Sequence, residues 1–165
     1  MVDEMITQED IDAFKAMNEP SSQVGLHDMP PDWDHPQPTL YQMVTDFAKR
    51  MDQPLNQPWG KDTELEDFRW NLIAEEYGEA FDEYCNRNNP ANMFKELLDI
   101  IIQSAGKCAA YGWDVDKGLL LVHASNMSKL GLDGKPLKNA EGKVLKGPNY
   151  KPANLQDLVE TNNEK

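Results

Sequence analysis

Residues 62–86 read DTELEDFRWNLIAEEYGEAFDEYCN, and this stretch decides the fold. It contains no proline and is long enough for about seven turns of an α-helix. Placing successive residues 100° apart puts Leu65, Phe68 and Leu72 on one face. Four acidic residues continue that face over the following turns: Glu75, Glu76, Glu79 and Glu83. The stretch therefore predicts a long helix in which one face changes from apolar to acidic.

Three other stretches have the spacing and end signals of helices. They are residues 40–51 after an N-cap at Thr39, residues 91–111 between Pro90 and Gly112, and residues 115–130 after an N-cap at Asp114. Four helices of this length, joined by short connections, predict an all-α fold of the four-helix-bundle type.

The two ends of the chain differ from this helical middle. Residues 1–38 are acidic and hold five prolines after Glu19, which predicts an arm rather than a continuous helix, with a short amphipathic helix near its start. The turn signals LDGK (132–135) and AEGK (140–143) predict a β-hairpin-like tail after the last long helix. The predicted organisation is an arm over 1–38, an all-α domain over 39–155 and a tail over 156–165.

The charge of the chain limits the classes of partner. Its 165 residues carry 29 acidic and 16 basic side chains, a formal charge of −13, which argues against a duplex nucleic-acid binder. No apolar stretch reaches the ~20 residues of a membrane span, and the first residues lack an apolar signal region, so we expect a cytoplasmic protein with no membrane partner. Residues 130–165, with 5 acidic and 6 basic groups, are the least acidic part.

A second acidic pair lies on the helix predicted over 91–111. Glu96 and Asp99 are three residues apart, so both side chains reach the same point beside the helix. An isolated pair of this kind is usually a solvated helix face. Two antiparallel helices joined by a short loop, however, bring it opposite the glutamates of residues 75–79. Five carboxylates facing one another form an oxygen-rich site suited to Mg²⁺, or to Mn²⁺ in its place.

These two acidic motifs resemble the signature of a known enzyme family. EEYGE (75–79) followed by ELLD (96–99) is similar to the EExxE…ExxD motif of the all-α nucleoside triphosphate pyrophosphatases, the MazG-like group. FRWNLIAEE (68–76) and the segment from VHASNMSK to NYKPANL (122–155) resemble its phosphoribosyl-ATP pyrophosphohydrolase-like branch, found in phages and bacteria. The resemblance covers roughly residues 39–155.

The resemblance implies Mg²⁺-dependent hydrolysis of a nucleoside triphosphate to the monophosphate and pyrophosphate, in the cytoplasm of a bacterium or of a phage-infected cell. It implies dUTP, dCTP or a guanine nucleotide as substrate, and includes a subgroup that supplies dGMP for modified phage genomes. The added arm and longer tail argue against the phosphoribosyl-ATP enzyme of histidine synthesis. The family's pairing of bundles implies a homodimer or homotetramer in which a neighbouring chain completes each site.

The same resemblance assigns roles to individual residues. It implies that Glu75, Glu79, Glu96 and Asp99 hold the metal, and that Glu76 is a further ligand or the base that activates water. It implies phosphate contacts from the basic end of the domain: Asn126, Lys129, Lys135 and Lys146. The base pocket is implied to lie between the first long helix and its neighbours, with these candidates: Phe47, Asn56, Trp59, Trp70 and Asn71.

Two alternatives remain beside this interpretation. For each aromatic residue of the base-pocket set, ordinary core packing is the more common explanation. The acidic arm also favours a second hypothesis of a different class, a non-catalytic acidic helical bundle that binds a protein partner.

Overall fold

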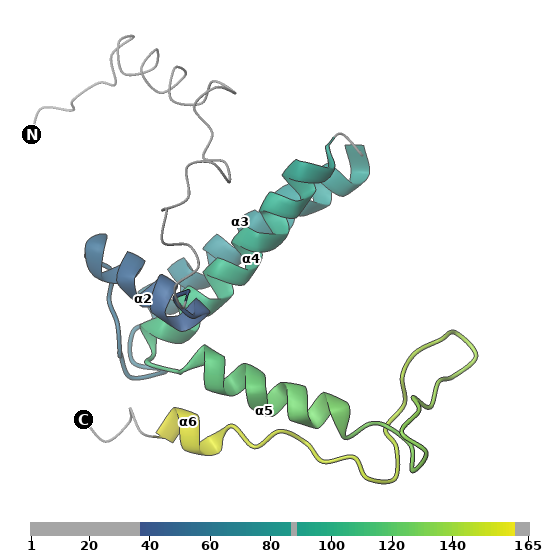
Figure 1. The fold of residues 1–165 in the computed structure, drawn as a ribbon. Helices are drawn as coiled ribbons and strands as arrows, with labels where there is room; N and C mark the ends of the chain where they lie inside the picture. Colours follow the sequence, from purple (N-terminus) through teal and green to yellow (C-terminus); the bar gives the residue numbers. More distant parts are fainter. Residues whose placement is uncertain (1–36, 87–88, 161–165) are drawn as a thin grey trace, which may run out of the picture. The chain divides into compact units, whose positions relative to one another are not determined.

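The structure, a computed structural model, describes residues 37–86 and 89–160. Its helices are α2 (Leu40–Arg50), α3 (Thr63–Asn86), α4 (Pro90–Ala110), α5 (Val115–Met127) and α6 (Gln156–Glu160), shown in Figure 1. The described residues contain no sheet, so the all-α prediction is confirmed. Residues 1–36, with most of the predicted arm and its short helix, lie outside the described part of the chain.

The helices begin at the residues that their capping chemistry favours. Thr39 and Gln42 form a capping box at α2, each side chain bonding the other residue's backbone N–H. Asn89 accepts a hydrogen bond from the N–H of Ala91 at 2.8 Å and caps α4, and Asp114 caps α5. These local bonds satisfy N–H groups that the first helical turn leaves free. The helices therefore begin close to the residues that the sequence predicts.

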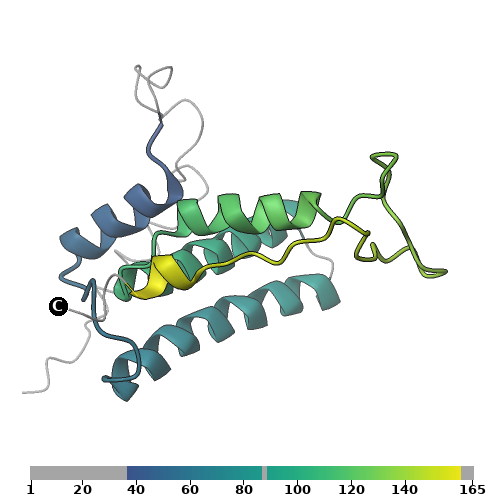
Figure 2. The same cartoon turned by 90° about the horizontal axis from the view of Figure 1, so that it is seen from below.

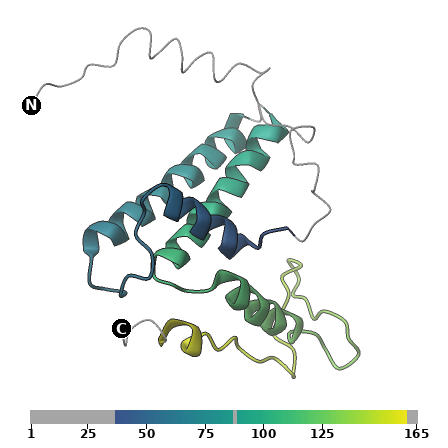
Figure 3. The same cartoon turned by 60° about the vertical axis from the view of Figure 1, so that its left-hand side comes forward.

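Three of the helices pack closely. α3 and α4 run antiparallel and lie side by side (Figures 1 and 2), and α2 lies across α4 (Figure 3). Val44 of α2 packs against Ala105 and Ala109 of α4, which are 1% and 0% exposed. Alanine at both positions lets the two helix backbones approach closely, so this contact is the centre of the small core.

The loop between α2 and α3 is held against the C-terminal end of α4. The N–H of Gln53 donates to the carbonyl of Ala48 at 2.8 Å, and the N–H of Gln57 donates to that of Ala110 at 2.7 Å. Asn56 adopts the left-handed region, with φ of 55°, which asparagine tolerates better than most residues. This backbone path fixes Gln53 in the space between α2, α3 and α4.

α5 is attached more sparsely. It contacts α2 and α4; the carboxylate of Asp116 accepts a hydrogen bond from the N–H of Tyr41 at 3.2 Å. None of the residues of α5 is buried. The segment after α5 returns along it, with the Ser125 hydroxyl donating to the carbonyl of Lys151 at 2.8 Å. α5 is thus a fourth long helix that joins the others through α2 and α4, and the four-helix-bundle type stays a prediction.

The predicted hairpin-like tail consists of two turns rather than paired strands. Antiparallel bridges join Leu130 to Pro136 and Lys138 to Val144, and each is isolated. Gly134 and Gly142 lie at the turns with φ of 73° and 83°, the left-handed conformation that favours glycine. No described helix combines the length and the apolar character that crossing a bilayer requires.

Candidate metal centre and adjoining pocket

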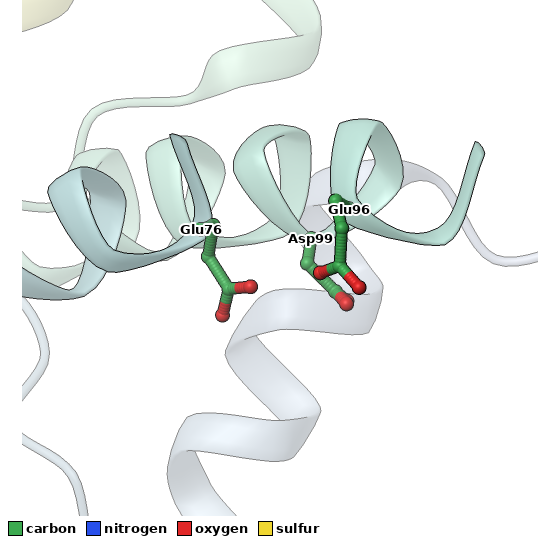
Figure 4. Close-up of side chains that lie close together, drawn as sticks. All are labelled: Glu76, Glu96 and Asp99. Atoms are coloured by element: carbon green, nitrogen blue, oxygen red, sulfur yellow. The ribbon is translucent and has the colours of Figure 1, made fainter. Parts of the chain in front are cut away.

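Three carboxylates from α3 and α4 meet at one point. Glu76 of α3 and Glu96 and Asp99 of α4 each place an oxygen within 4.8 Å of the other two (Figure 4). Glu96 is only 7% exposed, which is unusual for a charged group and indicates that its charge is compensated. The antiparallel packing of α3 on α4 therefore brings the two acidic motifs together.

One ammonium group neutralises part of this charge. Lys95 Nζ lies 3.0 Å from Glu96 Oε2 and 2.8 Å from Asp99 Oδ2, and these two bonds raise the pKa of Lys95. The side-chain amide of Gln103 donates to Glu76 Oε1 at 3.5 Å. Three carboxylates against one exposed lysine leave net negative charge, so the cluster still attracts a cation.

Glu79 belongs to the same electrostatic neighbourhood. Repulsion from Glu96 is the main cause that raises the pKa of Glu79, with desolvation, a hydrogen bond to Glu96 and repulsion from Glu76 adding to it. Glu75 is exposed and lies outside the group of three. Of the five predicted metal ligands, the structure thus brings three together, places Glu79 beside Glu96, and leaves Glu75 apart.

The donor set fits a hard divalent cation. All donors are carboxylate oxygens, which suit Mg²⁺ or Mn²⁺ and not a metal that prefers nitrogen or sulfur. The three oxygens lie within 4.8 Å of one another, and ligands on opposite sides of a Mg²⁺ ion lie about 4.2 Å apart, so one ion could contact all three after a small closing of the side chains. Glu96 and Asp99 would hold the ion, with Glu76 and Glu79 beside it.

A pocket adjoins the carboxylates. It has a volume of about 530 Å³ and lies between α2, α3 and α4. Asp99 and Gln103, both members of the acidic neighbourhood, form part of its wall. The rest of the wall is mainly apolar and includes two aromatic rings, Phe47 and Phe68. A flat apolar group in the pocket would therefore lie next to the negative charges of the candidate metal centre.

Arg69 is the unexpected residue of this pocket. Its side chain lines the wall although the residue is only 3% exposed, and its Nη2 donates to Gln53 Oε1 at 3.0 Å. Its Nε is buried without a hydrogen-bond partner, and among the described residues Arg69 forms no ion pair. Burial lowers the pKa of this guanidinium, which nevertheless stays protonated.

The structure does not place all the predicted base-pocket residues in the pocket. Phe47 lines the pocket, whereas Asn56, Trp59, Trp70 and Asn71 are not among its lining residues. Trp59 instead contacts Tyr111 and Trp113, with ring centroids 4.9 and 5.2 Å away. For Trp59, the structure favours the alternative of aromatic packing.

The predicted phosphate contacts lie together at the far end of α5 and in the tail. Lys129 Nζ donates to Asn126 Oδ1 at 2.7 Å, and Lys146 Nζ lies 4.4 Å from the centre of the Tyr150 ring. Lys135 is exposed in the first turn of the tail. In the part of the chain that is described, no hydrogen bond or ion pair joins these four residues to the carboxylates.

Arg69, Gln53 and Lys95 were not anticipated from the sequence as site residues. The spacing of Leu65, Arg69, Leu72 and Glu76 does contain a signal for Arg69, because steps of four and three residues keep one helix face. A basic residue on a helix face that is otherwise mainly apolar indicates a buried charge, and buried charges are often part of a functional site. No corresponding pattern identifies Gln53, whose place depends on the conformation of a loop.

Comparison with known proteins adds no assignment. No protein-family model and no curated protein matches the chain. The features of the chain that bear on its function are therefore the carboxylates, the pocket and their shared residue Asp99.

Proposed function

We propose that this chain is a Mg²⁺-dependent pyrophosphohydrolase of nucleoside triphosphates. In the proposed reaction, the oxygen of water bonds to the α-phosphorus, the bond to the bridging oxygen breaks, and pyrophosphate leaves. The observation that carries the proposal is that Asp99 belongs both to the carboxylate group and to the pocket wall. A base in the pocket would place its phosphates beside the candidate metal centre.

The residues of the site have complementary roles in this proposal. Glu96 and Asp99 would hold the cation with Glu79 beside them, and a cation held there would supply positive charge to the phosphate oxygens. Glu76 accepts the proton of the attacking water, because it is a half-buried carboxylate at the edge of the same group. Gln103 orients Glu76 through its side-chain amide, and the rings of Phe47 and Phe68 flank the base.

A panel of the common ribonucleoside and deoxyribonucleoside triphosphates tests this reaction. The full chain with Mg²⁺ is expected to release pyrophosphate and a monophosphate from at least one of them, and excess EDTA is expected to stop the release. Release of single phosphates instead would indicate a different bond cleavage. Absence of hydrolysis across the panel would favour the acidic bundle that binds a protein partner.

The proposal includes self-association into a homodimer or homotetramer. Large apolar side chains remain exposed on α4 and α5 in one chain, for example Phe94 at 63% and Leu120 at 69%. The basic residues around Lys129 also lie apart from the carboxylates of their own chain, so a second copy is the proposed source of phosphate contacts. Light scattering on the purified protein is expected to give at least twice the mass of one chain; a fully active monomer would contradict this part of the proposal.

A further inference from the structure

The environment of Arg69 calls for an additional acceptor. A guanidinium group that is withdrawn from water normally pairs with a carboxylate, because an unpaired buried charge is costly. Arg69 is only 3% exposed. Its one hydrogen-bond acceptor among the described residues is the neutral amide oxygen of Gln53. Its Nε is left with no acceptor although the side chain lines the pocket. A ligand in the pocket can offer an acceptor to Nη1 of the same guanidinium, which lies next to Gly106 of the pocket wall.

The polar groups at this end of the pocket are hydrogen-bond donors. Gln53 uses its side-chain oxygen for Arg69 Nη2, which leaves its NH₂ group available. Within the described residues, neither that NH₂ group nor Arg69 Nη1 has a hydrogen-bond partner. Gly106 adds no side chain here, and a Cβ at that position would lie 3.5 Å from Arg69 Nη1. Arg69 Nη1 and the NH₂ group of Gln53 are therefore two donors beside this space that lack an acceptor among the described residues.

We propose that Arg69 and Gln53 select a 6-oxopurine base, guanine or hypoxanthine, by donating to its O6 and N7 atoms. This inference rests on the proposed nucleotide hydrolysis. The O6–N7 edge presents two adjacent acceptors and no donor, so it matches a pair of donors formed by Arg69 Nη1 and the NH₂ group of Gln53. Adenine replaces O6 with an amino donor, and uracil separates its two carbonyl oxygens with the N3–H donor, so each would set a donor against Arg69 or Gln53. Cytosine presents N3 and O2 as adjacent acceptors on a smaller ring, and the binding of dCMP tests this base separately.

Binding of monophosphates tests the selection without requiring hydrolysis. Titration calorimetry on the full chain is expected to show dGMP and dIMP binding about tenfold or more tightly than dAMP, the discrimination of one bidentate contact. 7-Deaza-dGMP, which lacks the N7 acceptor, is expected to bind as weakly as dAMP. Equal binding of these nucleotides, or tighter binding of dAMP, dCMP or dUMP, would overturn the inference.

Two substitutions assign the selection to these residues. Arg69→Gln is expected to reduce the preference for dGMP over dAMP to within about twofold, whereas Arg50→Gln, on the exposed face of α2, is expected to leave it unchanged. Gln53→Glu is the second variant: it gives Arg69 a carboxylate partner, removes the NH₂ donor, and is expected to weaken dGMP binding without loss of folding. If Arg69→Gln does not fold, the Gln53→Glu result decides. Unchanged dGMP preference in a folded variant would contradict the assignment.

The two proposals fail in different ways. Selective binding of dGMP and dIMP without hydrolysis of any triphosphate would refute the proposed reaction and leave base selection standing. Hydrolysis of all triphosphates at similar rates, with no preference among monophosphates, would support the reaction and refute the selection.

Discussion

Asp99→Asn is expected to lower kcat for pyrophosphate release about 1000-fold. Asp99 supplies one of the three oxygens that lie within 4.8 Å of one another, and it is also part of the pocket wall. The amide keeps the shape of the side chain but removes its charge, so it binds a divalent cation poorly. A loss of about 4 kcal/mol of transition-state stabilisation corresponds to that factor and is in the range expected of metal-assisted catalysis.

The experiment separates loss of chemistry from loss of structure. Asp99→Asn is expected to keep the helical circular dichroism of the wild type, because Lys95 retains Glu96 as a partner, and to bind Mg²⁺ more weakly in calorimetry. Asp82→Asn, which removes an equivalent charge from an exposed position of α3, is the matched control and is expected to keep full activity. Activity of Asp99→Asn within tenfold of wild type would mean that Asp99 does not hold a catalytic metal.

The helices could be predicted because their signals are local. Thr39, Pro90 and Asp114 act within one turn of the chain, and each lies at an observed helix start. The chain returning over Ser128 was not visible in the sequence: the N–H of Lys151 donates to the Ser128 hydroxyl at 2.8 Å, beyond the end of α5 at Met127. A helix end that depends on a distant segment has no local signal.

The rotation of α3 about its axis differs from the one that the sequence predicts. The 100° spacing of helical residues predicts that Leu65, Phe68 and Leu72 face the core. In the structure, however, Phe68 is 51% exposed and Arg69 is buried. The buried face therefore lies on the side of Arg69 and Glu76. Neighbouring residues of a helix point 100° apart, so the rotation of α3 about its axis decides which glutamate faces α4. In the structure Glu76, rather than Glu75, joins Glu96 and Asp99. Tertiary packing sets that angle, so the sequence predicts the acidic group but not all its members.

Ala109→Glu is expected to lower the free energy of unfolding by more than about 3 kcal/mol. Ala109 is completely buried and packs with Val44 where α2 meets α4. A glutamate there has no room beside Val44 and brings a carboxylate into an apolar contact, and burial of an unpaired charge is among the most destabilising single changes. Domains of this size have only about 5–15 kcal/mol of stability in total. Urea unfolding followed by circular dichroism measures the change.

The consequence for the site follows from what Ala109 holds in place. Its carbonyl accepts a hydrogen bond from the N–H of Asn56, in the loop that carries Gln53, and α2 supplies Phe47 to the pocket. A variant that still folds is therefore expected to lose dGMP binding, because α2 and the loop leave the pocket, while Glu96 and Asp99, both on α4, still bind Mg²⁺. Ala74→Glu, at an exposed position of α3, is the control and is expected to change stability by less than about 0.5 kcal/mol. Equal stability of the two variants would show that the α2–α4 contact does not support the pocket.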